Sequence, residues 1–261
     1  MMNSYNDDDF TIHGGCKPLT EPLDQIKQLM KFTRGNKQKI KVRKEEVTVN
    51  GVFMRLITFK PAKHQCDDIL YNRNKILRDI FPRGCSFICL PNGDIIRAFG
   101  TRKFVGYESI HDDEKQDLVL SGKMDINDNE FIPLSGRKIA DTKKIYYTEK
   151  SNGENCKCGG FYYDSVFYLW AGSKMTIKVW KADEPVDTCE LTEESHADYP
   201  NDTICTLWSK FYLSLNEQRR DYLQGLFNSL TVTSFVGEIN RPWGEHIVPI
   251  THLFIEFFTL L

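Results

Sequence analysis

The alternation of apolar and polar residues predicts several antiparallel strands in the first half of the chain. Residues 39–43 alternate between cationic and branched apolar side chains, which is the pattern of a strand with one solvated face. Residues 47–59 predict a hairpin, because Asn50-Gly51 is a preferred dipeptide of the two-residue type I′ turn. Residues 85–90 and 94–99 predict a second hairpin around a Pro-Asn-Gly turn.

In three places a helical period of apolar residues replaces this alternation. Residues 21–32 and 67–80 predict short helices, and residues 203–230 carry the strongest period, which predicts one long helix capped by Asp202. Further strands are predicted at residues 160–163, 166–171 and 176–180, twice within 231–249, and at the end of the chain.

Many antiparallel strands with a few helices between them predict an α+β fold. With 261 residues and 41% hydrophobic residues, the chain is long and apolar enough to bury a sizeable core. We expect the acidic residues 1–12 to be a disordered tail and residues 13–261 to form one domain.

Charge and the N-terminal sequence bear on the possible partners of the protein and on its cellular compartment. The net charge of −2 gives no global signal for nucleic acid, but residues 36–44 are strongly basic. This stretch is either a solvated edge strand or a patch for an RNA backbone. The N-terminus has no basic and apolar leader, and no apolar run reaches the roughly 18 residues of a membrane span. We therefore expect an intracellular protein, cytoplasmic or nuclear, with reduced thiols.

Common nucleotide and metal motifs are missing from the sequence. It contains no Walker phosphate loop, no Gly-x-Gly-x-x-Gly and no His-Glu-x-x-His. Cys156-x-Cys158 has no second pair at zinc-ribbon spacing, so we expect two thiols in a strand and no metal ligands among the site residues.

The most informative stretch is Glu149-Lys150-Ser151-Asn152-Gly153, between a basic β-rich segment and a Gly/Cys/aromatic run. A lysine attacks as a nucleophile only in its neutral form, and its reference pKa is about 10.4. Burial and neighbouring cations can lower that pKa by about three units, or roughly 4 kcal/mol. Lys-x-x-Gly is common in surface turns, so the interpretation depends on other segments of the chain.

Those segments resemble the ATP-dependent RNA ligases, especially the phage RNA ligase 1-like branch and its eukaryotic relatives. The stretch around Lys150 is similar to the family's nucleotidyl-lysine motif. Arg83-Gly84 and Lys103-Phe104 resemble elements that precede the nucleophile in RNA ligases. After Lys150, the strand end at Ser173-Lys174 and the acidic segment around Glu238 are similar to two later motifs. The order and spacing of these segments, from about residue 80 to the C-terminus, carry the resemblance.

The resemblance implies a nucleotidyltransferase domain of two antiparallel sheets with flanking helices, and an activity that belongs to RNA repair. Lys150 would attack ATP and hold AMP, with Mg²⁺ as cofactor. The AMP would pass to a 5′-phosphate RNA end, and a 3′-hydroxyl end would displace it. The nucleotide site would comprise Glu149 and Gly153 beside the lysine, Arg83, Lys103 and Lys174 near the phosphates, and Glu238 at the ribose.

One departure keeps alternatives open. The family's Glu-Gly-x-Val and Lys-x-Lys elements, expected after the final strand, are not found before Leu261. We therefore expect a domain that is incomplete at its C-terminus, and a second chain is one expected source of the missing elements. A truncated gene, half of a split enzyme and an inactive relative all fit this pattern. The alternative functions are an mRNA-capping-type guanylyltransferase and a non-catalytic RNA-binding remnant of a ligase.

Overall fold

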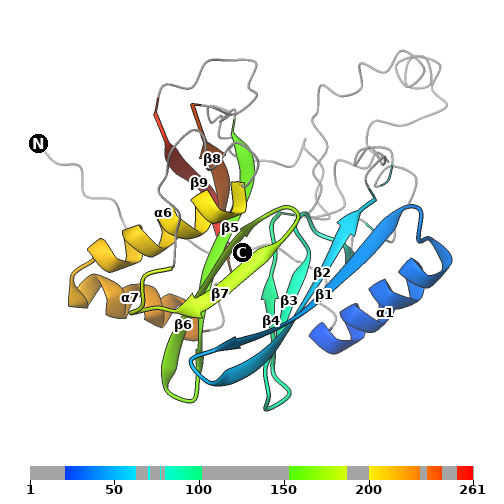
Figure 1. Cartoon of the computed structure of the whole chain (residues 1–261), viewed down its shortest axis with the longest axis horizontal. Helices are drawn as coiled ribbons and strands as arrows, with labels where there is room; N and C mark the ends of the chain where they lie inside the picture. Colours follow the sequence, from blue (N-terminus) through cyan, green and yellow to red (C-terminus); the bar gives the residue numbers. More distant parts are fainter. Residues whose placement is uncertain are drawn as a thin grey trace, which may run out of the picture. The chain divides into compact units, whose positions relative to one another are not determined.

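The part of the chain that can be described forms two antiparallel sheets and three well-defined helices (Figure 1). The computed structural model describes residues 21–62, 70, 77, 80–101, 153–186, 200–229, 234–242 and 252–260. All of them belong to one compact unit that comprises residues 21–103 and 149–261. The tail predicted at residues 1–12 lies outside the described residues.

The first sheet has the strand order β1-β2-β3-β4. Its strands are β1 (Ile40–Val49), β2 (Val52–Pro61), β3 (Ser86–Cys89) and β4 (Ile95–Ala98). Both predicted hairpins are confirmed, and Asn50 and Gly51 have φ angles of 48° and 75°, as a type I′ turn requires. Helix α1 (Pro22–Gly35) packs its Leu29 into the core formed by one face of this sheet.

The second sheet has the order β7-β6-β5-β8-β9. Its strands are β5 (Glu154–Tyr163), β6 (Val166–Ser173), β7 (Ile177–Lys181), β8 (Phe235–Asn240) and β9 (Phe254–Leu260). β5 begins six residues before its predicted start at residue 160, directly after Gly153. The other strand expected within 231–249 falls outside the described residues, as does most of the helix predicted at 67–80, of which Leu70, Leu77 and Ile80 are described and helical.

The single long helix predicted at residues 203–230 is wrong. The structure has two helices, α6 (Pro200–Ser214) and α7 (Glu217–Asn228), and Asn216 caps the second by accepting a hydrogen bond from the Arg219 amide. Asp202 is not a cap; it lies within the first turn of α6, where its carboxylate is 2.6 Å from Lys178 Nζ. The apolar period continues in phase across the break, which is why the sequence indicated one helix.

The two sheets pack face to face, with helices on their outer faces. Met54, Leu56 and Ile88 of the first sheet share a buried cluster with Tyr168 and Trp170 of the second. Helices α6 and α7 cover the other face of the second sheet, where Trp208 and Phe227 join the thiols of β5 in a separate core. The α+β class with two antiparallel sheets is therefore confirmed. Within the described residues, no helix has both the length and the hydropathy that a membrane crossing requires.

The break between α6 and α7 can be tested by substitution of Asn216, because alanine should change the free energy of unfolding in opposite directions at a helix cap and inside a continuous helix. Replacing the Asn216 cap (Asn216→Ala) should lower the free energy of unfolding by about 1 kcal/mol, because the Arg219 amide loses its acceptor. Asn216→Asp, which keeps an acceptor, should stay near the parent value. In a continuous helix, alanine would raise stability instead, and urea denaturation with that result would refute the cap.

Candidate functional site

The structure describes four of the seven residues that the sequence predicts for the site. Arg83, Gly153, Lys174 and Glu238 can be placed. Lys150, Glu149 and Lys103 lie outside the described residues. Gly153 directly precedes β5, Glu238 is on β8 beside it, Lys174 directly follows β6, and Arg83 is in a turn before β3.

Gly153 and Glu238 are in direct contact. The Gly153 amide donates a hydrogen bond of 3.0 Å to Glu238 Oε2, although 85 residues separate the two in sequence. A Cβ at Gly153 would lie 2.4 Å from the Ile239 carbonyl oxygen, so the glycine is needed for close packing against β8. Arg241 does not neutralise Glu238, which was the structural alternative for that carboxylate; Arg241 is buried and pairs with Glu154.

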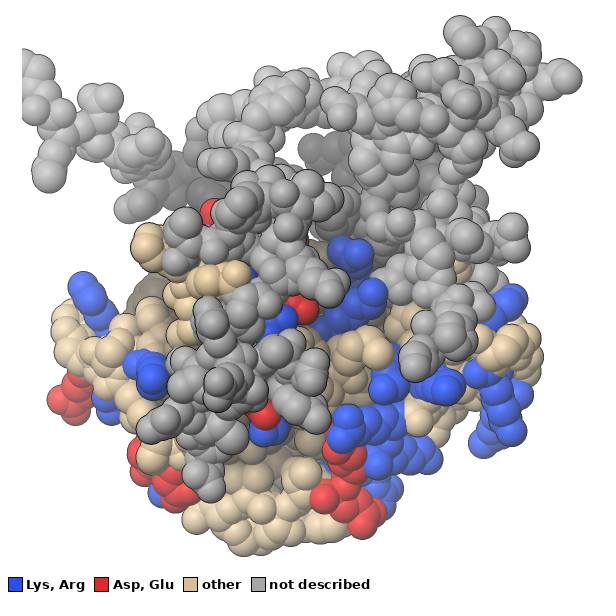
Figure 2. Space-filling view, turned by 45° about the horizontal axis from the view of Figure 1, so that its top comes forward, with Lys and Arg blue, Asp and Glu red and all other residues tan. Residues whose placement is uncertain are grey.

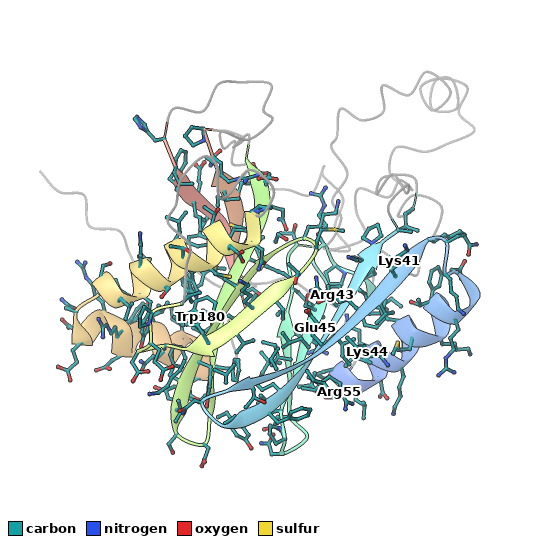
Figure 3. All side chains as sticks on the ribbon, in the orientation of Figure 1. Lys41, Arg43, Lys44, Glu45, Arg55 and Trp180 are labelled. Carbon is teal, nitrogen blue, oxygen red and sulfur yellow. The ribbon has the colours of Figure 1, made fainter. Side chains whose placement is uncertain are left out.

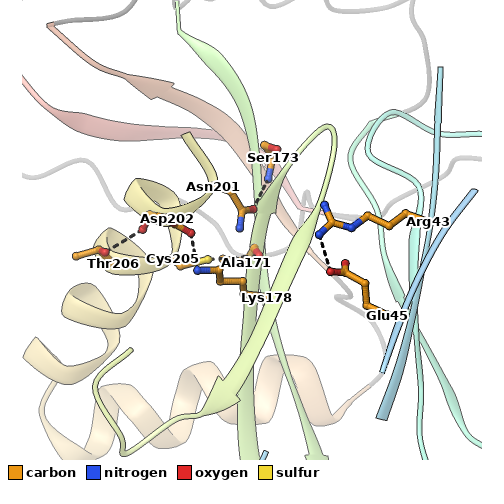
Figure 4. A network of polar contacts seen from close by, with 9 residues as sticks. All are labelled: Arg43, Glu45, Ala171, Ser173, Lys178, Asn201, Asp202, Cys205 and Thr206. Atoms are coloured by element: carbon orange, nitrogen blue, oxygen red, sulfur yellow. Dashed lines mark hydrogen bonds and ion pairs between the residues drawn. The ribbon is translucent and has the colours of Figure 1, made fainter. Parts of the chain in front are cut away.

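The strand end at Ser173-Lys174 lies opposite the segment of β5 that follows Gly153. Ser173 is directly opposite Cys156, which is three residues after Gly153. Asn201 of α6 fixes this end of the strand, because its Oδ1 accepts from the Ser173 amide at 3.2 Å (Figure 4). The Ser173 hydroxyl in turn accepts from the Met175 amide. The half-buried Lys174 is therefore held by backbone contacts on both sides.

Arg83 and Gly84 form a turn at the end of the first sheet. Gly84 has a φ of 61°, a left-handed conformation that favours glycine. The Arg83 amide donates to Thr101, and the Arg83 carbonyl accepts from the Gly100 amide at 2.8 Å. This turn is tied to the second sheet, because the Gly84 carbonyl accepts a hydrogen bond from Lys157 of β5.

Lys157 is fully buried and joins the two sheets. Besides Gly84, its amine contacts Ser86 Oγ at 3.0 Å and the Ala98 carbonyl at 2.8 Å. Burial lowers the pKa of Lys157 to about 7, and the nearby Cys85 thiol opposes this shift. A neutral amine can keep all three contacts by donating to the two carbonyls and accepting from the Ser86 hydroxyl. The sequence analysis missed this residue, although a lysine between two cysteines in a buried strand was a signal for it.

Asn155 of β5 is a further polar residue on the face between the two sheets. It is directly opposite Glu238 in the β5–β8 pair and two residues before Lys157, so all three share the face toward the first sheet. Its Oδ1 is buried without a hydrogen-bond partner among the described residues, 3.4 Å from the position of a Cβ at Gly100. A buried acceptor in that state costs free energy unless a donor reaches it. The amide group thus offers one acceptor beside Glu238.

Chemically, this arrangement combines the cationic residues Arg83 and Lys174 with the Glu238 carboxylate near the beginning of β5, where the Glu154 carboxylate is already paired with Arg241. Such a site suits an anionic ligand that also carries hydroxyl or amine donors. The described residues contain no group of three metal-ligating side chains. Comparisons of the chain with models of protein families, with curated proteins and with solved structures gave no match.

The close approach of Gly153 to β8 can be tested with a matched control. Gly153→Ala should lower the free energy of unfolding by about 1–3 kcal/mol, because its Cβ meets the Ile239 carbonyl. Gly225→Ala in α7 meets no atom within 4 Å and should raise stability by up to about 1 kcal/mol. If urea denaturation gave the same change in the free energy of unfolding for both substitutions, Gly153 would not be packed closely against the Ile239 carbonyl.

The buried amine predicts a pH dependence of stability. The pKa of Lys157 is about 7 in the folded chain and has its ordinary value of 10.5 when unfolded. Between these values the unfolded chain binds one more proton, so stability rises with pH by up to about 1.4 kcal/mol per unit. Below about pH 7, where both forms are protonated, the dependence should be flat.

The measurement compares the parent with Lys157→Met by urea denaturation from about pH 6 to 8.5. Burial raises the pKa of Cys85 and of Cys205, which lowers stability at alkaline pH in both proteins, so the difference between them isolates the amine. A difference that stays flat above pH 7 would mean that the three acceptor oxygens keep the amine charged.

Proposed function

We propose that this chain carries the nucleotidyltransferase domain of an ATP-dependent RNA ligase. The resemblance of its segments to that family suggests the activity, and the positions of the described residues support it. Two antiparallel sheets packed face to face with outer helices agree with the expected domain architecture. The proposal assigns Lys150, four residues before β5 in the sequence, as the nucleophile.

The observation that carries the proposal is the contact between Gly153 and Glu238. The glycine belongs to the lysine motif and the carboxylate to a motif 85 residues later, yet one hydrogen bond joins them. Arg83-Gly84, from a third motif, is held beside β5 through Lys157. Segments that resemble one family in sequence thus converge in space, which independent chance matches do not require.

The reach of the chain is compatible with this assignment. Lys150 is three residues before Gly153, and three residues span at most about 11 Å. The Lys150 backbone is therefore within that distance of Gly153, whose amide contacts Glu238, so a ligand bound at Glu238 is within reach of this part of the chain. Glu238 is half-buried, and one of its two oxygens is engaged by Gly153, which leaves the other for a ribose hydroxyl.

The proposed reaction has three balanced steps. The neutral Lys150 amine attacks the α-phosphorus of ATP, a nitrogen–phosphorus bond forms, pyrophosphate leaves and the amine loses a proton. A 5′-phosphate oxygen of RNA then attacks the phosphorus of the bound AMP, the nitrogen–phosphorus bond breaks, and the lysine leaves as an amine that regains a proton. Finally, the 3′-hydroxyl oxygen attacks the activated 5′-phosphorus and loses its proton, a phosphodiester bond forms, and the phosphorus–oxygen bond to AMP breaks. Arg83, Lys103 and Lys174 would stabilise the negative charge on the phosphates.

The proposed Mg²⁺ fits this site only as an ion that arrives with the nucleotide. The described residues lack a cluster of three ligating side chains. Mg²⁺ in nucleotide sites is commonly held by phosphate oxygens, waters and one or two carboxylates. When bound, the ion would neutralise charge on the triphosphate.

Lys157 is a competing lysine that the experiment must separate from Lys150. Its lowered pKa suits a nucleophile. However, its side chain has no exposed surface, and Gly84, Ser86 and Ala98 surround its amine. No nucleotide can approach it without separating the sheets, so we assign it a structural role.

The decisive measurement is intact mass after incubation with ATP and Mg²⁺. We expect the addition of one AMP, lost in Lys150→Ala and retained in Lys210→Ala, a control on the exposed surface of α6. Lys174→Ala should slow formation of the adduct roughly 100-fold, as expected when one charge-stabilising group is removed. Tryptic mapping identifies the modified lysine, because AMP on Lys150 blocks cleavage there.

Other outcomes would replace the proposal. An adduct from GTP but not ATP would indicate the capping-type guanylyltransferase. An adduct on Lys157 would overturn the assignment of the nucleophile. Folded protein that binds RNA and forms no adduct, even with a second chain supplying the missing elements, would indicate the non-catalytic remnant.

A further inference from the structure

Two lysines face each other across the β1–β2 hairpin. Lys41 of β1 is directly opposite Lys60 of β2, and Arg43 is opposite Thr58 one row further along. Figure 2 shows Lys and Arg side chains gathered on the side of the molecule that β1, β2 and α1 form. Figure 3 labels Lys41 and Arg43 on β1.

These cations are on the inner face of the first sheet, which is the face toward the second sheet. The register between β1 and β2 is continuous, so residues two apart share a face. Val47 and its partner Met54, in phase with Lys41 and Lys60, belong to the core between the sheets. The alternate residue Ile40 packs in the core that α1 covers. The lysines therefore extend the inner face beyond the region where apolar side chains fill it.

Among the residues that the structure describes, no carboxylate pairs with either lysine. Arg43 pairs with Glu45 at 2.6 Å, and this pair points from β1 toward the β6–β7 hairpin (Figure 4). Neither Lys41 nor Lys60 makes an ion pair with any residue that the structure describes. Like charges directly opposite each other in a sheet are destabilising. The fold thus retains a repulsive pair that an external anion would relieve.

The pair leads to the candidate site. Thr58 is opposite Ser86, and the Phe59 amide donates to the Cys85 carbonyl, so Lys60 directly follows the paired end of β2 and the Arg83-Gly84 turn directly precedes the paired end of β3. Lys41, Lys60 and the Arg83-Gly84 turn therefore follow one another from the edge strand β1 across β2 to the start of β3. Neighbouring strands are about 4.8 Å apart, so side chains as long as those of Lys41 and Lys60 can contact two successive phosphates.

We propose that Lys41 and Lys60 bind the phosphodiester backbone of a single-stranded RNA end and guide it to the site at β5. This inference rests on the proposed function, because it takes the ligand of the row to be the RNA that the ligase would join. It resolves the two interpretations of residues 36–44 in favour of an RNA contact for Lys41, which faces inward, whereas Lys44 is on the α1 face.

The test measures binding of a 5′-phosphorylated single-stranded RNA without ATP, by fluorescence anisotropy over a range of salt concentrations. The variant Lys41→Gln/Lys60→Gln is compared with Lys31→Gln/Lys210→Gln, which removes two exposed lysines from α1 and α6. Each phosphate contact on a single strand contributes about 0.7 to the slope of log K against log salt. The first variant should lose about 1.4 from that slope and roughly 25-fold in affinity at about 0.1 M salt, and the control variant neither.

Stability and adenylylation are measured on the same proteins. Because the repulsion is removed, Lys41→Gln/Lys60→Gln should unfold at the same or a higher temperature than the parent. Equal losses of RNA affinity in both variants, or an unchanged slope in the first, would overturn the inference. A loss confined to adenylylation would assign the pair to ATP phosphates instead. The expected loss of slope, together with an AMP adduct that stays absent when a second chain is added, would refute the ligase and support the RNA surface.

Discussion

The contact of Lys157 with the end of the first sheet sets the geometry of everything around the candidate site. Its amine is fully buried and reaches oxygens of Gly84, Ser86 and Ala98. A buried amine that lost these partners would cost several kcal/mol, so the two sheets are held in one alignment at this level. The same contact keeps the Arg83-Gly84 turn beside β5, the strand that begins directly after Gly153.

Around Lys157, the segments of the candidate site are held by contacts from different elements. Glu238 of β8 accepts a hydrogen bond from the Gly153 amide, directly before β5. Asn201 of α6 holds the strand end before Lys174. The inner face of β1 and β2 brings lysines toward the turn at Gly84. The site is therefore supported by both sheets and by a helix, and local unfolding of any one of them would separate its charges.

Local signals in the sequence predicted the first hairpin well. A type I′ turn requires positive φ angles at both central residues, and Asn50-Gly51 is one of the few dipeptides that adopt them readily. The long helix failed, since the apolar period runs in phase through Asn216 and only capping chemistry marks the break. For the site, the resemblance assigned Gly153 and Glu238 to one nucleotide site, and the hydrogen bond between them was not itself predicted. The resemblance did not reveal the role of Lys157 or the Lys41–Lys60 pair, because cross-strand register and sheet packing bring those residues into contact.

The Gly84–Lys157 contact also links the evolution of two positions that are 73 residues apart. A Cβ at Gly84 would lie 3.1 Å from the Lys157 amine, in a backbone conformation that side chains rarely adopt. While the lysine remains, a side chain at position 84 would have to shift the Lys157 amine as well as adopt that conformation. A lineage that first shortened residue 157 could later accept asparagine at 84, since asparagine tolerates the left-handed region. The cost of a side chain at position 84 therefore depends on the length of the side chain at position 157.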